Sequence, residues 1–177
     1  FARWVPAPVR LRSAEILVVG RTHQFVRVVS TDGVEGVVKA NSRMEEVTSL
    51  FHQVAVPAFM GRDLRDLQAI LADLFRAQYK FAGLAFWAAV GHLELAVWDL
   101  LGKTGRRRCV DMMGGAVRET IPIYVSSLDR NSSPEREVEN LRRAVAETGA
   151  TGVKIKVGGR RSRNADAAPG RSEAVVA

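Results

Sequence analysis

A strand–helix–strand pattern within residues 121–157 constrains the fold of this chain more than any other feature of its sequence. Residues 121–127 form a short apolar run that predicts a strand, and residues 151–157 predict another. Between them, Ser133, Pro134 and Glu135 supply the cap, first-turn proline and acidic residue of a helix start, and Gly149 is placed to end that helix. Two strands joined in this way must be parallel, with a right-handed crossover.

This pair of strands needs partners that the sequence does not supply. Parallel strands are stable only when both faces are covered and their edges are paired. After Val157 about twenty residues remain: a loop rich in Gly, Arg, Asn and Pro, then residues 171–177, which predict the first turns of another helix. We therefore expect the chain to be the truncated beginning of a longer protein.

Three runs rich in β-branched residues lie near the start of the chain, at residues 14–19, 24–30 and 34–39. A turn-like segment at residues 20–23 separates the first two runs. The turn Thr31-Asp32-Gly33 follows the second run, and its Asp-Gly dipeptide suits a tight hairpin. The pattern predicts a three-stranded antiparallel meander with one exposed face and one face that other elements must cover.

Three predicted helices are available to cover that face. Residues 44–54 carry apolar side chains at three- and four-residue spacing, and Pro57 is expected to end this helix. Asp63 is predicted to cap the second helix. Residues 84–103 predict the longest helix, which is apolar on most of its circumference and hence buried, with Gly102 and Gly105 marking its end.

The sequence pattern changes after Met113-Gly114-Gly115, which predicts a domain boundary. We expect residues 1–117 to form an α+β domain, with the meander and its helices, and residues 118–177 to begin a second domain with the strand–helix–strand unit.

The distribution of charged residues along the chain indicates which kinds of binding partner to expect. The 177 residues carry a net charge of +7, and the segment from Lys154 onward holds six basic residues against two acidic ones. The excess is therefore concentrated at one end of the chain rather than spread as a stripe. Aromatic residues are not interleaved with these arginines, so no stacking platform for nucleic acid is expected. A basic module that binds a polyanion is the weakest of the functions considered.

Cysteine content and hydropathy favour the cytoplasm. Cys109 is the one cysteine, so no internal disulfide can form, which fits a reducing compartment. The longest apolar run, residues 84–91, is soon broken by His92 and Glu94 and is too short to span a bilayer. No secretory leader opens the chain. We expect a cytoplasmic protein with no membrane partner and no nucleic-acid partner.

Lys154 and Lys156 are the candidate catalytic residues. Both lie in the second predicted strand of the pattern, where alternation directs them to one face and Val153, Ile155 and Val157 to the face that the helices cover. Two ammonium groups about 7 Å apart repel each other by about 2.4 kcal/mol at an effective dielectric constant near 20, which favours one uncharged amine that can act as a base. The alternative is an exposed edge strand with two solvated lysines.

Several motifs occur in an order and at a spacing that resemble one enzyme family. They are Thr31-Asp32-Gly33-x-x-Gly36, Glu94-x-Ala96-x-Trp98-Asp99-Leu100-Leu101-Gly102-Lys103, Met112-Met113-Gly114-Gly115, Ile121-Pro122-Ile123-Tyr124, Gly149-x-x-Gly152-x-Lys154-x-Lys156 and Val157-Gly158-Gly159-Arg160. Each motif is weak alone. Together, and from about Ala14 onward, they make the chain similar to the mandelate racemase/muconate lactonizing branch of the enolase superfamily.

The resemblance implies an α+β capping domain followed by the first β/α units of an incomplete (β/α)8 TIM-type barrel. Members of the family use Mg²⁺ to stabilise the enediolate that forms when a base removes the proton alpha to a carboxylate. The resemblance makes Lys156 that base and Lys154 its electrostatic neighbour. The metal carboxylates of the family lie on the third to fifth barrel strands, so this chain holds no metal ligands, and we expect it to be inactive alone.

The resemblance also suggests residues that select the substrate. Two loops of the capping domain do so in the family, and they correspond to residues 20–24 and 41–43. Arg21, His23, Asn41 and Arg43 are therefore candidates, and Arg160 is a further contact for an anionic substrate, together with Arg161 and Arg163. The alternative is that all are ordinary polar loop residues. His52 and His92 lie within predicted helices, and we interpret both as packing or surface residues.

The expected parent protein is a Mg²⁺-dependent sugar-acid dehydratase or a racemase that acts on a small-molecule hydroxy-carboxylate, and works as a homo-oligomer. The alternative is a non-catalytic remnant or oligomerisation fragment that persists only by pairing with another chain, because its parallel edge is exposed.

Overall fold

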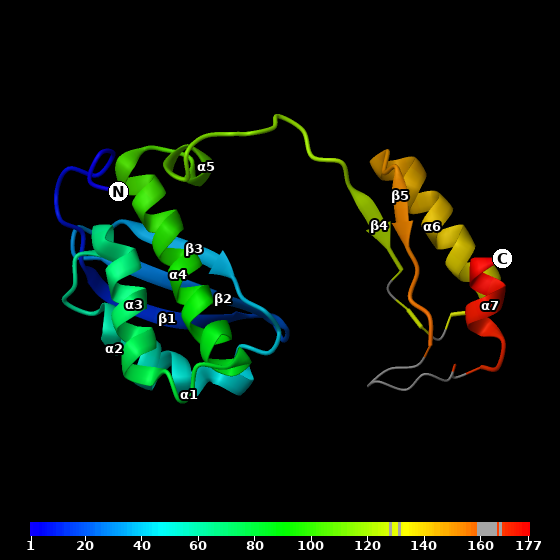
Figure 1. Cartoon of the computed structure of the whole chain (residues 1–177), viewed down its shortest axis with the longest axis horizontal. Helices are drawn as coiled ribbons and strands as arrows, with labels where there is room; N and C mark the ends of the chain where they lie inside the picture. Colours follow the sequence, from blue (N-terminus) through cyan, green and yellow to red (C-terminus); the bar gives the residue numbers. More distant parts are fainter. Residues whose placement is uncertain (128, 131, 159–165, 167) are drawn as a thin grey trace. The chain divides into compact units, whose positions relative to one another are not determined.

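The computed structural model of the chain describes residues 1–127, 129–130, 132–158, 166 and 168–177. The chain divides into two compact units, Phe1–Ala116 and Val117–Ala177 (Figure 1). The first unit contains an antiparallel sheet and its helices, and the second contains a parallel pair of strands joined through a helix.

Three antiparallel strands form the sheet of the first unit: β1 (Leu11–Val19), β2 (His23–Ser30) and β3 (Glu35–Lys39). Alternation along β2 places Val26 and Val28 on the covered face, where both are fully buried. Arg27, between them, points to the open face and donates two hydrogen bonds of 2.6 and 2.8 Å to its cross-strand partner Glu15. The predicted meander with one covered face is confirmed.

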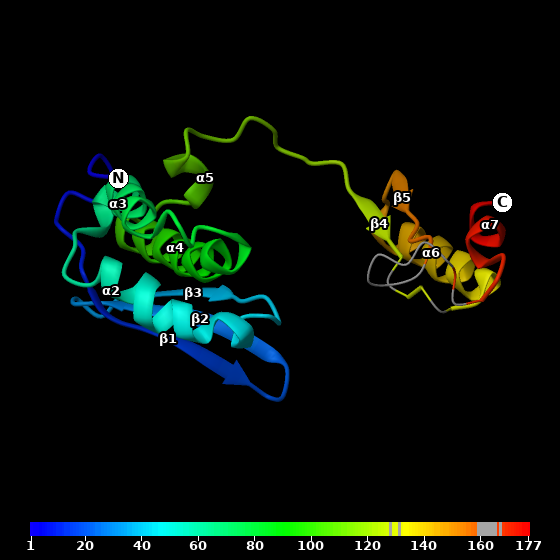
Figure 2. The same cartoon turned by 60° about the horizontal axis from the view of Figure 1, so that its bottom comes forward.

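Helices pack on the covered face. In chain order they are a 3-10 turn (Glu45–Val47), α1 (Thr48–Leu50), a π-helical turn (Phe51–Ala55), α2 (Val56–Phe59), a second 3-10 turn (Leu64–Asp66), α3 (Leu67–Gln78), α4 (Leu84–Gly105) and α5 (Cys109–Met112). The long helix α4 packs against β2 and β3. Figure 2 shows α3 and α4 on the same side of the sheet.

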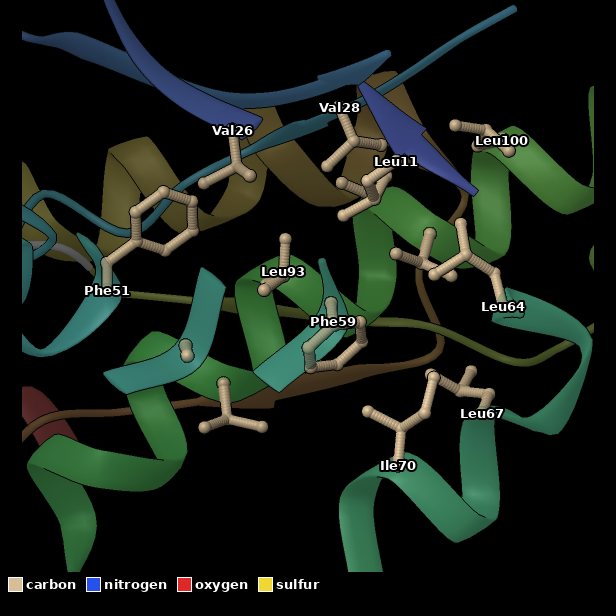
Figure 3. Close-up of a cluster of buried hydrophobic side chains, with 14 of the residues drawn as sticks. Leu11, Val26, Val28, Phe51, Phe59, Leu64, Leu67, Ile70, Leu93 and Leu100 are labelled. Atoms are coloured by element: carbon tan, nitrogen blue, oxygen red, sulfur yellow. The ribbon is translucent and has the colours of Figure 1, made fainter. Parts of the chain in front are cut away.

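The core of the first unit lies between the sheet and these helices (Figure 3). Each layer contributes apolar side chains that are at most 3% exposed: Leu11, Val26 and Val28 from the sheet, Phe51, Phe59 and Leu64 from the turns and α2, Leu67 and Ile70 from α3, and Leu93 and Leu100 from α4. Burial of such side chains is the main stabilising contribution to a domain of this size.

The first predicted helix does not end at Pro57, and that prediction was wrong. The chain stays helical as far as Phe59. A π-helical turn precedes the proline, and the amide of Val56 bonds to the carbonyl of Phe51, five residues earlier. Pro57 then lies in the first turn of α2, where a residue without an N–H group is tolerated.

The edge strand β3 lies directly against α4 at Gly36. A Cβ atom built on Gly36 would lie 2.1 Å from the carbonyl oxygen of Ala96, so only glycine fits. The next amide of the strand, that of Val37, donates to Asp99 Oδ2 on α4 at 2.8 Å. Lys103 Nζ donates to the same oxygen at 2.7 Å. The Asp99 carboxylate therefore attaches the sheet edge to the helix, which gives these motif residues a structural role.

The helix α4 ends at Gly105 and not at Gly102. Arg106 follows it in the left-handed region, with φ of 50°. The amide of Arg106 donates to the carbonyl of Lys103 at 3.2 Å, and that of Arg107 donates to the carbonyl of Gly102 at 2.9 Å, which is the Schellman pattern of a helix end. Gly102 lies inside the helix, where a Cβ atom would be 2.9 Å from the Arg107 carbonyl oxygen. Gly102 therefore permits a close approach rather than ending the helix.

We expect Arg106→Gly to stabilise the first unit by about 1 kcal/mol, because a residue with a Cβ atom pays that cost in the left-handed region and glycine does not. Urea unfolding followed by circular dichroism measures the change. Arg107→Gly is the control, since residue 107 lacks a positive φ and should gain no stability from glycine. A variant Arg106→Gly that unfolds at the same urea concentration as the wild type would contradict the assignment of strain to residue 106.

By length and composition alone, α4 is long and apolar enough to cross a membrane. The expectation from residues 84–91 considered only the most apolar run and missed this. In the structure, 44% of the most apolar stretch of α4 is buried inside the protein, and Leu93, Val97 and Leu100 are fully buried in the core. The packing of α4 is therefore that of a core helix.

Asp63 begins the second predicted helix as expected. Its Oδ1 accepts hydrogen bonds from the amides of Arg65 (3.1 Å) and Val9 (3.2 Å), and the Arg65 guanidinium contacts the carboxylate at 2.7 Å. These bonds lower the pKa of Asp63, and the bond from the Arg65 side chain has the largest effect. The carboxylate thus joins the segment before β1 to the start of the helix.

A lowered pKa means that Asp63 stabilises the fold at pH values above its ordinary pKa, and that this contribution is lost as the pH falls through the folded-state value. We expect Asp63→Asn to cost about 1 kcal/mol at pH 7, because the amide can still cap the helix but loses the charge-assisted bonds from the Arg65 guanidinium. The cost should be smaller in acid, where the carboxylate becomes protonated. Urea unfolding at pH 7 and at pH 3 tests this. An equal loss at both pH values would show that the charge of Asp63 does not contribute.

The second unit contains β4 (Tyr124–Ser126), α6 (Pro134–Thr148), β5 (Gly152–Lys154) and α7 (Arg171–Val176). β4 and β5 pair in parallel, with Val125 opposite Val153. The Ser133 side chain caps α6, and Gly149 ends it with φ of 66°. The predicted strand–helix–strand unit with a parallel pair is confirmed.

Both strands of the second unit are shorter than predicted. The ladder continues as far as the Ser127 amide, which donates to the Lys154 carbonyl at 2.9 Å. The next available amide, that of Lys156, donates instead to the Ser127 side chain. Because this amide bonds to a hydroxyl and not to a backbone carbonyl, β5 ends at Lys154, and the prediction of a strand over residues 151–157 was wrong at that end.

Candidate functional site

The two candidate catalytic lysines lie at and just beyond the carboxyl end of β5. Lys154 is the last residue of the strand and is exposed. Lys156 follows two residues later and is half-buried, so the prediction that both lie inside the strand holds for Lys154 alone. Val153 and Ile155 line a groove with apolar residues of α6, including Leu141. The apolar side of this segment therefore faces the helix, as predicted.

Side chains from other segments hold the backbone that carries Lys156. The Lys156 amide donates to Ser127 Oγ at 2.8 Å, and the Gly158 amide donates to Ser172 Oγ at 2.8 Å. The Ser172 amide in turn donates to Asp166 Oδ2 at 2.7 Å. Hydrogen bonds from the Ser172 hydroxyl and amide lower the pKa of Asp166, which keeps this carboxylate charged. Residues 156–158 are therefore fixed by hydrogen bonds to side chains of other segments.

The four substrate-contact candidates of the first unit gather at one end of its sheet. Arg21 lies in the turn between β1 and β2, and His23 is the first residue of β2. Asn41 and Arg43 follow the end of β3. The register that pairs Phe25 with Lys39, and the 2.8 Å bond from the Ala40 amide to the Gln24 carbonyl, place both segments at this end. All four candidates are exposed.

The segment with Asn41 and Arg43 is held by local bonds. Asn41 Oδ1 accepts a hydrogen bond from the Arg43 amide at 2.9 Å, and Arg43 Nη1 lies 3.8 Å from Glu46 Oε2. Asn41, Arg43 and His92 line a pocket of about 310 Å³ with the start of α4. Part of the Asn41 carboxamide is therefore committed to the turn, whereas Arg43 is an exposed residue of the pocket lining.

His92 supports this segment from α4. The Asn41 amide donates to His92 Nε2 at 3.0 Å, and His92 Nδ1 lies 2.6 Å from the Ala88 carbonyl oxygen. An imidazole whose Nε2 accepts carries its ring proton on Nδ1, where it can donate to the Ala88 carbonyl. The interpretation of His92 as a packing residue stands, but no sequence signal connects it to Asn41, which lies 51 positions away.

We expect His92→Leu to loosen the 41–43 segment without unfolding the first unit. Loss of the acceptor should raise the hydrogen-exchange rate of the Asn41 amide about tenfold, the effect of one net hydrogen bond. Exchange followed by NMR gives the rate. His52→Leu is the matched control, since His52 is exposed on a neighbouring helix and should leave Asn41 unchanged. An Asn41 amide equally protected in His92→Leu would remove His92 from this role.

Three predicted contacts, Arg160, Arg161 and Arg163, lie outside the described residues.

Gln24 is a residue that the sequence did not single out. Its Oε1 atom is buried, and among the described residues it has no hydrogen-bond partner. Gln24 is next to His23, so an unsatisfied acceptor lies at the same end of the sheet as the four candidates.

A sequence pattern for a known family decides the identity of the first unit. The pattern for the N-terminal domain of mandelate racemase/muconate lactonizing enzymes matches residues 5–114, which is more than half of the chain. The chain belongs to the mandelate racemase/muconate lactonizing enzyme family. The resemblance inferred from the motifs is therefore confirmed, and so is the fold class: an α+β capping domain at the beginning of the enolase fold.

Relatives within this family include dehydratases and racemases. A D-mannonate dehydratase of Caulobacter vibrioides is 28% identical over 119 residues, covering 65% of this chain and 30% of the relative. The structure of a proposed racemase from Roseobacter denitrificans is 30% identical, with a TM-score of 0.78, and the match covers 96% of this chain and 46% of that one.

A third member of this fold was solved with ligands. It is a proposed L-alanine-DL-glutamate epimerase from Burkholderia xenovorans, bound to magnesium and fumarate. It is 18% identical, with a TM-score of 0.71, and the match covers 84% of this chain and 41% of that one. That protein of the same fold was therefore solved with magnesium and a small carboxylate. The chain spans less than half the length of each of these three proteins.

In our chain of 177 residues, the part that the structure describes contains no group of three or more His, Cys, Asp or Glu side chains that could hold a metal ion. Mg²⁺ prefers carboxylate and water oxygens in a near-octahedral arrangement. The described residues therefore do not fit Mg²⁺, and no reaction step through the metal is assigned to them.

Proposed function

We propose that the intact protein is an enzyme that removes the proton alpha to the carboxylate of a hydroxy acid, with Lys156 as the base. The observation that carries the proposal is the position of Lys154 and Lys156 at the carboxyl end of β5, in a parallel unit whose other face is covered by α6. In parallel α/β folds, this end of the strands is where active sites form.

In the proposed reaction, the Lys156 amine accepts the α-proton, and the electron pair of the broken C–H bond moves into the carboxylate to give an enediolate. In dehydration, the electron pair of the enediolate then forms a Cα–Cβ double bond, and the β-hydroxyl takes a proton from a general acid and leaves as water. In racemisation, a general acid on the opposite face instead returns a proton to Cα. Lys154 adds a second positive charge at the carboxyl end of β5, which attracts an anionic substrate.

We propose a sugar acid as the substrate, in line with the D-mannonate dehydratase relative. Arg21, His23, Asn41 and Arg43 support this choice, because they present exposed cationic and polar side chains at one end of the sheet. Such side chains suit a ligand with one carboxylate and several hydroxyl groups. Arg160 is proposed as a further contact.

Magnesium is proposed as the cofactor of the intact protein, held by residues outside this sequence, where it would stabilise the negative charge of the enediolate. We further propose that the 177 residues alone are inactive, and that the enzyme works in the cytoplasm as a homo-oligomer, without nucleic-acid or membrane partners.

The test is solvent exchange of the α-proton. D-mannonate, other six-carbon sugar acids and mandelate are incubated separately with the intact protein in D2O with MgCl2, and the α-¹H signal is followed by NMR. We expect loss of this signal for at least one sugar acid, no loss after EDTA treatment and none with the 177-residue chain. Absence of exchange for every acid in the presence of Mg²⁺ would contradict the proposed function.

An oligomerisation fragment is the second candidate, and exposed apolar side chains of the second unit favour it. Ile121 is 76% exposed, Val153 50% and Val157 49%. Exposed apolar residues beside a parallel strand edge promote pairing with another chain. Intact-mass measurement of the native protein decides between the two: a mass near 19.4 kDa favours the fragment, and a larger mass favours the enzyme.

A further inference from the structure

We propose that Arg171 is a positioning residue that fixes the backbone of Lys156 and, through it, the place of the Lys156 amine. This inference rests on the proposed function, in which Lys156 is the base, and adds a residue to it. Arg171 is only 4% exposed although its side chain is charged. Burial of a charge is costly unless hydrogen bonds compensate it, so the partners of this guanidinium indicate its role.

Arg171, at the start of α7, donates hydrogen bonds to two other segments of the second unit. Its Nε donates to the Ser132 carbonyl at 2.7 Å, and Nη2 donates to the Asp129 carbonyl at 3.0 Å and to Ser132 Oγ at 3.2 Å. Its Nη1 donates to the Lys156 carbonyl at 3.3 Å. Residues 129 and 132 lie between β4 and α6, and Lys156 follows β5. A planar guanidinium with five donors can satisfy all these acceptors at once, which an ammonium group cannot.

A buried carboxylate balances the arginine through a hydroxyl. Ser132 Oγ, which accepts from Arg171, donates to Glu137 Oε2 at 2.6 Å. Glu137 is 2% exposed and lies in the first turns of α6. The result is a hydrogen-bonded row in which the Ser132 hydroxyl lies between two buried side chains of opposite charge, Arg171 and Glu137.

Lys156 depends on these side chains because β5 ends before it. Ser127 Oγ binds the amide of Lys156, and Arg171 binds its carbonyl. Arg130 continues the pattern, since its Nη1 donates to the carbonyls of Val157 and Gly158. Side chains therefore satisfy both backbone groups of Lys156.

The stability of α7 does not explain an arginine at this position. Arg171 is the first residue of α7, and a cation in the first turn of a helix interacts unfavourably with the helix dipole. Its bonds go instead to the segments that follow β4 and β5. The arrangement therefore favours a role in holding those segments, with Lys156 among them.

The test compares Arg171→Met and Arg171→Lys with Arg142→Met in the intact protein. Arg142 is exposed on α6 and is the matched control. For Arg171→Met we expect the Lys156 amide to exchange with solvent at least about tenfold faster. We also expect kcat for α-proton exchange to fall about 100-fold, as for a misplaced catalytic group, with KM changed less than about threefold. Arg171→Lys should recover only part of kcat.

The outcomes separate this inference from the proposed function. If Lys156→Ala abolishes turnover but Arg171→Met keeps the wild-type kcat or an unchanged Lys156 exchange rate, the positioning role is wrong and the proposed function stands. If Lys156→Ala keeps wild-type turnover, the proposed function fails, and the positioning role fails with it. Equal losses of kcat in Arg171→Met and Arg142→Met would also overturn the inference.

A second variant covers the case in which Arg171→Met does not fold. Ser127→Ala removes the acceptor of the Lys156 amide and leaves the charged row of Arg171 intact. We expect the same split, a lower kcat with little change in KM, and faster exchange at Lys156. Ser126→Ala, one residue earlier in β4, is its control, and a Ser127→Ala enzyme indistinguishable from it would overturn the inference.

Discussion

Lys156→Ala is expected to lower the rate of α-proton exchange in the intact protein by at least about 10³-fold, the contribution of a positioned general base. The loss should fall on kcat, because the amine acts on a proton that is transferred only in the transition state. Alanine leaves the backbone bonds of Lys156 to Ser127 and Arg171 in place, so the fold should persist. The α-¹H signal in D2O with MgCl2 measures the rate, and circular dichroism verifies the fold.

Lys80→Ala is the control for this experiment. Lys80 is exposed in the first unit, where its ammonium group lies 5.8 Å from the ring centre of Tyr79, and its removal should leave exchange unchanged. Lys154→Ala should give a smaller loss than Lys156→Ala, because Lys154 acts through its charge. Undiminished exchange in Lys156→Ala would assign the base to another residue.

Gly36→Ala is expected to destabilise the first unit by more than about 3 kcal/mol, a large part of the stability of a typical domain. The new methyl carbon would lie 2.1 Å from the Ala96 carbonyl oxygen and 2.7 Å from the Leu100 amide nitrogen. Both are backbone atoms of α4, so no side-chain rotation relieves the contact. β3 must move away from the helix, which also separates Val37 from Asp99.

Urea unfolding followed by circular dichroism measures this loss, and Gly91→Ala is the control. Gly91 also belongs to α4, but a Cβ atom there meets nothing within 4 Å. Alanine should stabilise the helix at that position by up to about 1 kcal/mol. Opposite signs for the two variants are therefore expected, and a Gly36→Ala protein as stable as the wild type would contradict the packing of β3 on α4.

Features that depend on neighbouring residues were predictable from the sequence. The Asp-Gly turn and the β-branched runs identified the meander, because hairpin geometry is local. Ser133 and Gly149 bounded α6 correctly, because a cap and a left-handed glycine act within one turn of the helix. The apolar alternation around Val153 indicated which side of β5 faces α6.

Features that depend on residues far apart in the chain were not predictable. The motif around Asp99 and Lys103 identified the family, but not the bond from Asp99 to the amide of Val37, 62 positions earlier. The support of Asn41 by His92 also joins distant positions. The local rule that proline ends a helix failed at Pro57, because a π-helical turn with buried Phe51 and Ala55 precedes it and places the proline in the first turn of α2.

The candidate site shows the same division. The Lys-x-Lys pattern identified Lys154 and Lys156 by number, whereas the end of β5 between them follows from the Ser127 hydroxyl, 29 positions before Lys156. Arg171 drew no attention in the sequence, since an arginine near the start of a short helix is usually solvated. Only its burial and its bonds to two distant segments distinguish it.

The most direct test of Lys156 as the base removes its amine and then restores it chemically. Lys156→Cys in the intact protein should be inactive, and treatment with 2-bromoethylamine should convert the new thiol to a lysine-like amine. Wild-type protein treated in the same way controls for reaction at Cys109, and iodoacetamide gives a neutral adduct for comparison. We predict that α-proton exchange returns after 2-bromoethylamine and not after iodoacetamide. Complete modification at position 156, verified by mass spectrometry, with no return of exchange would contradict the account.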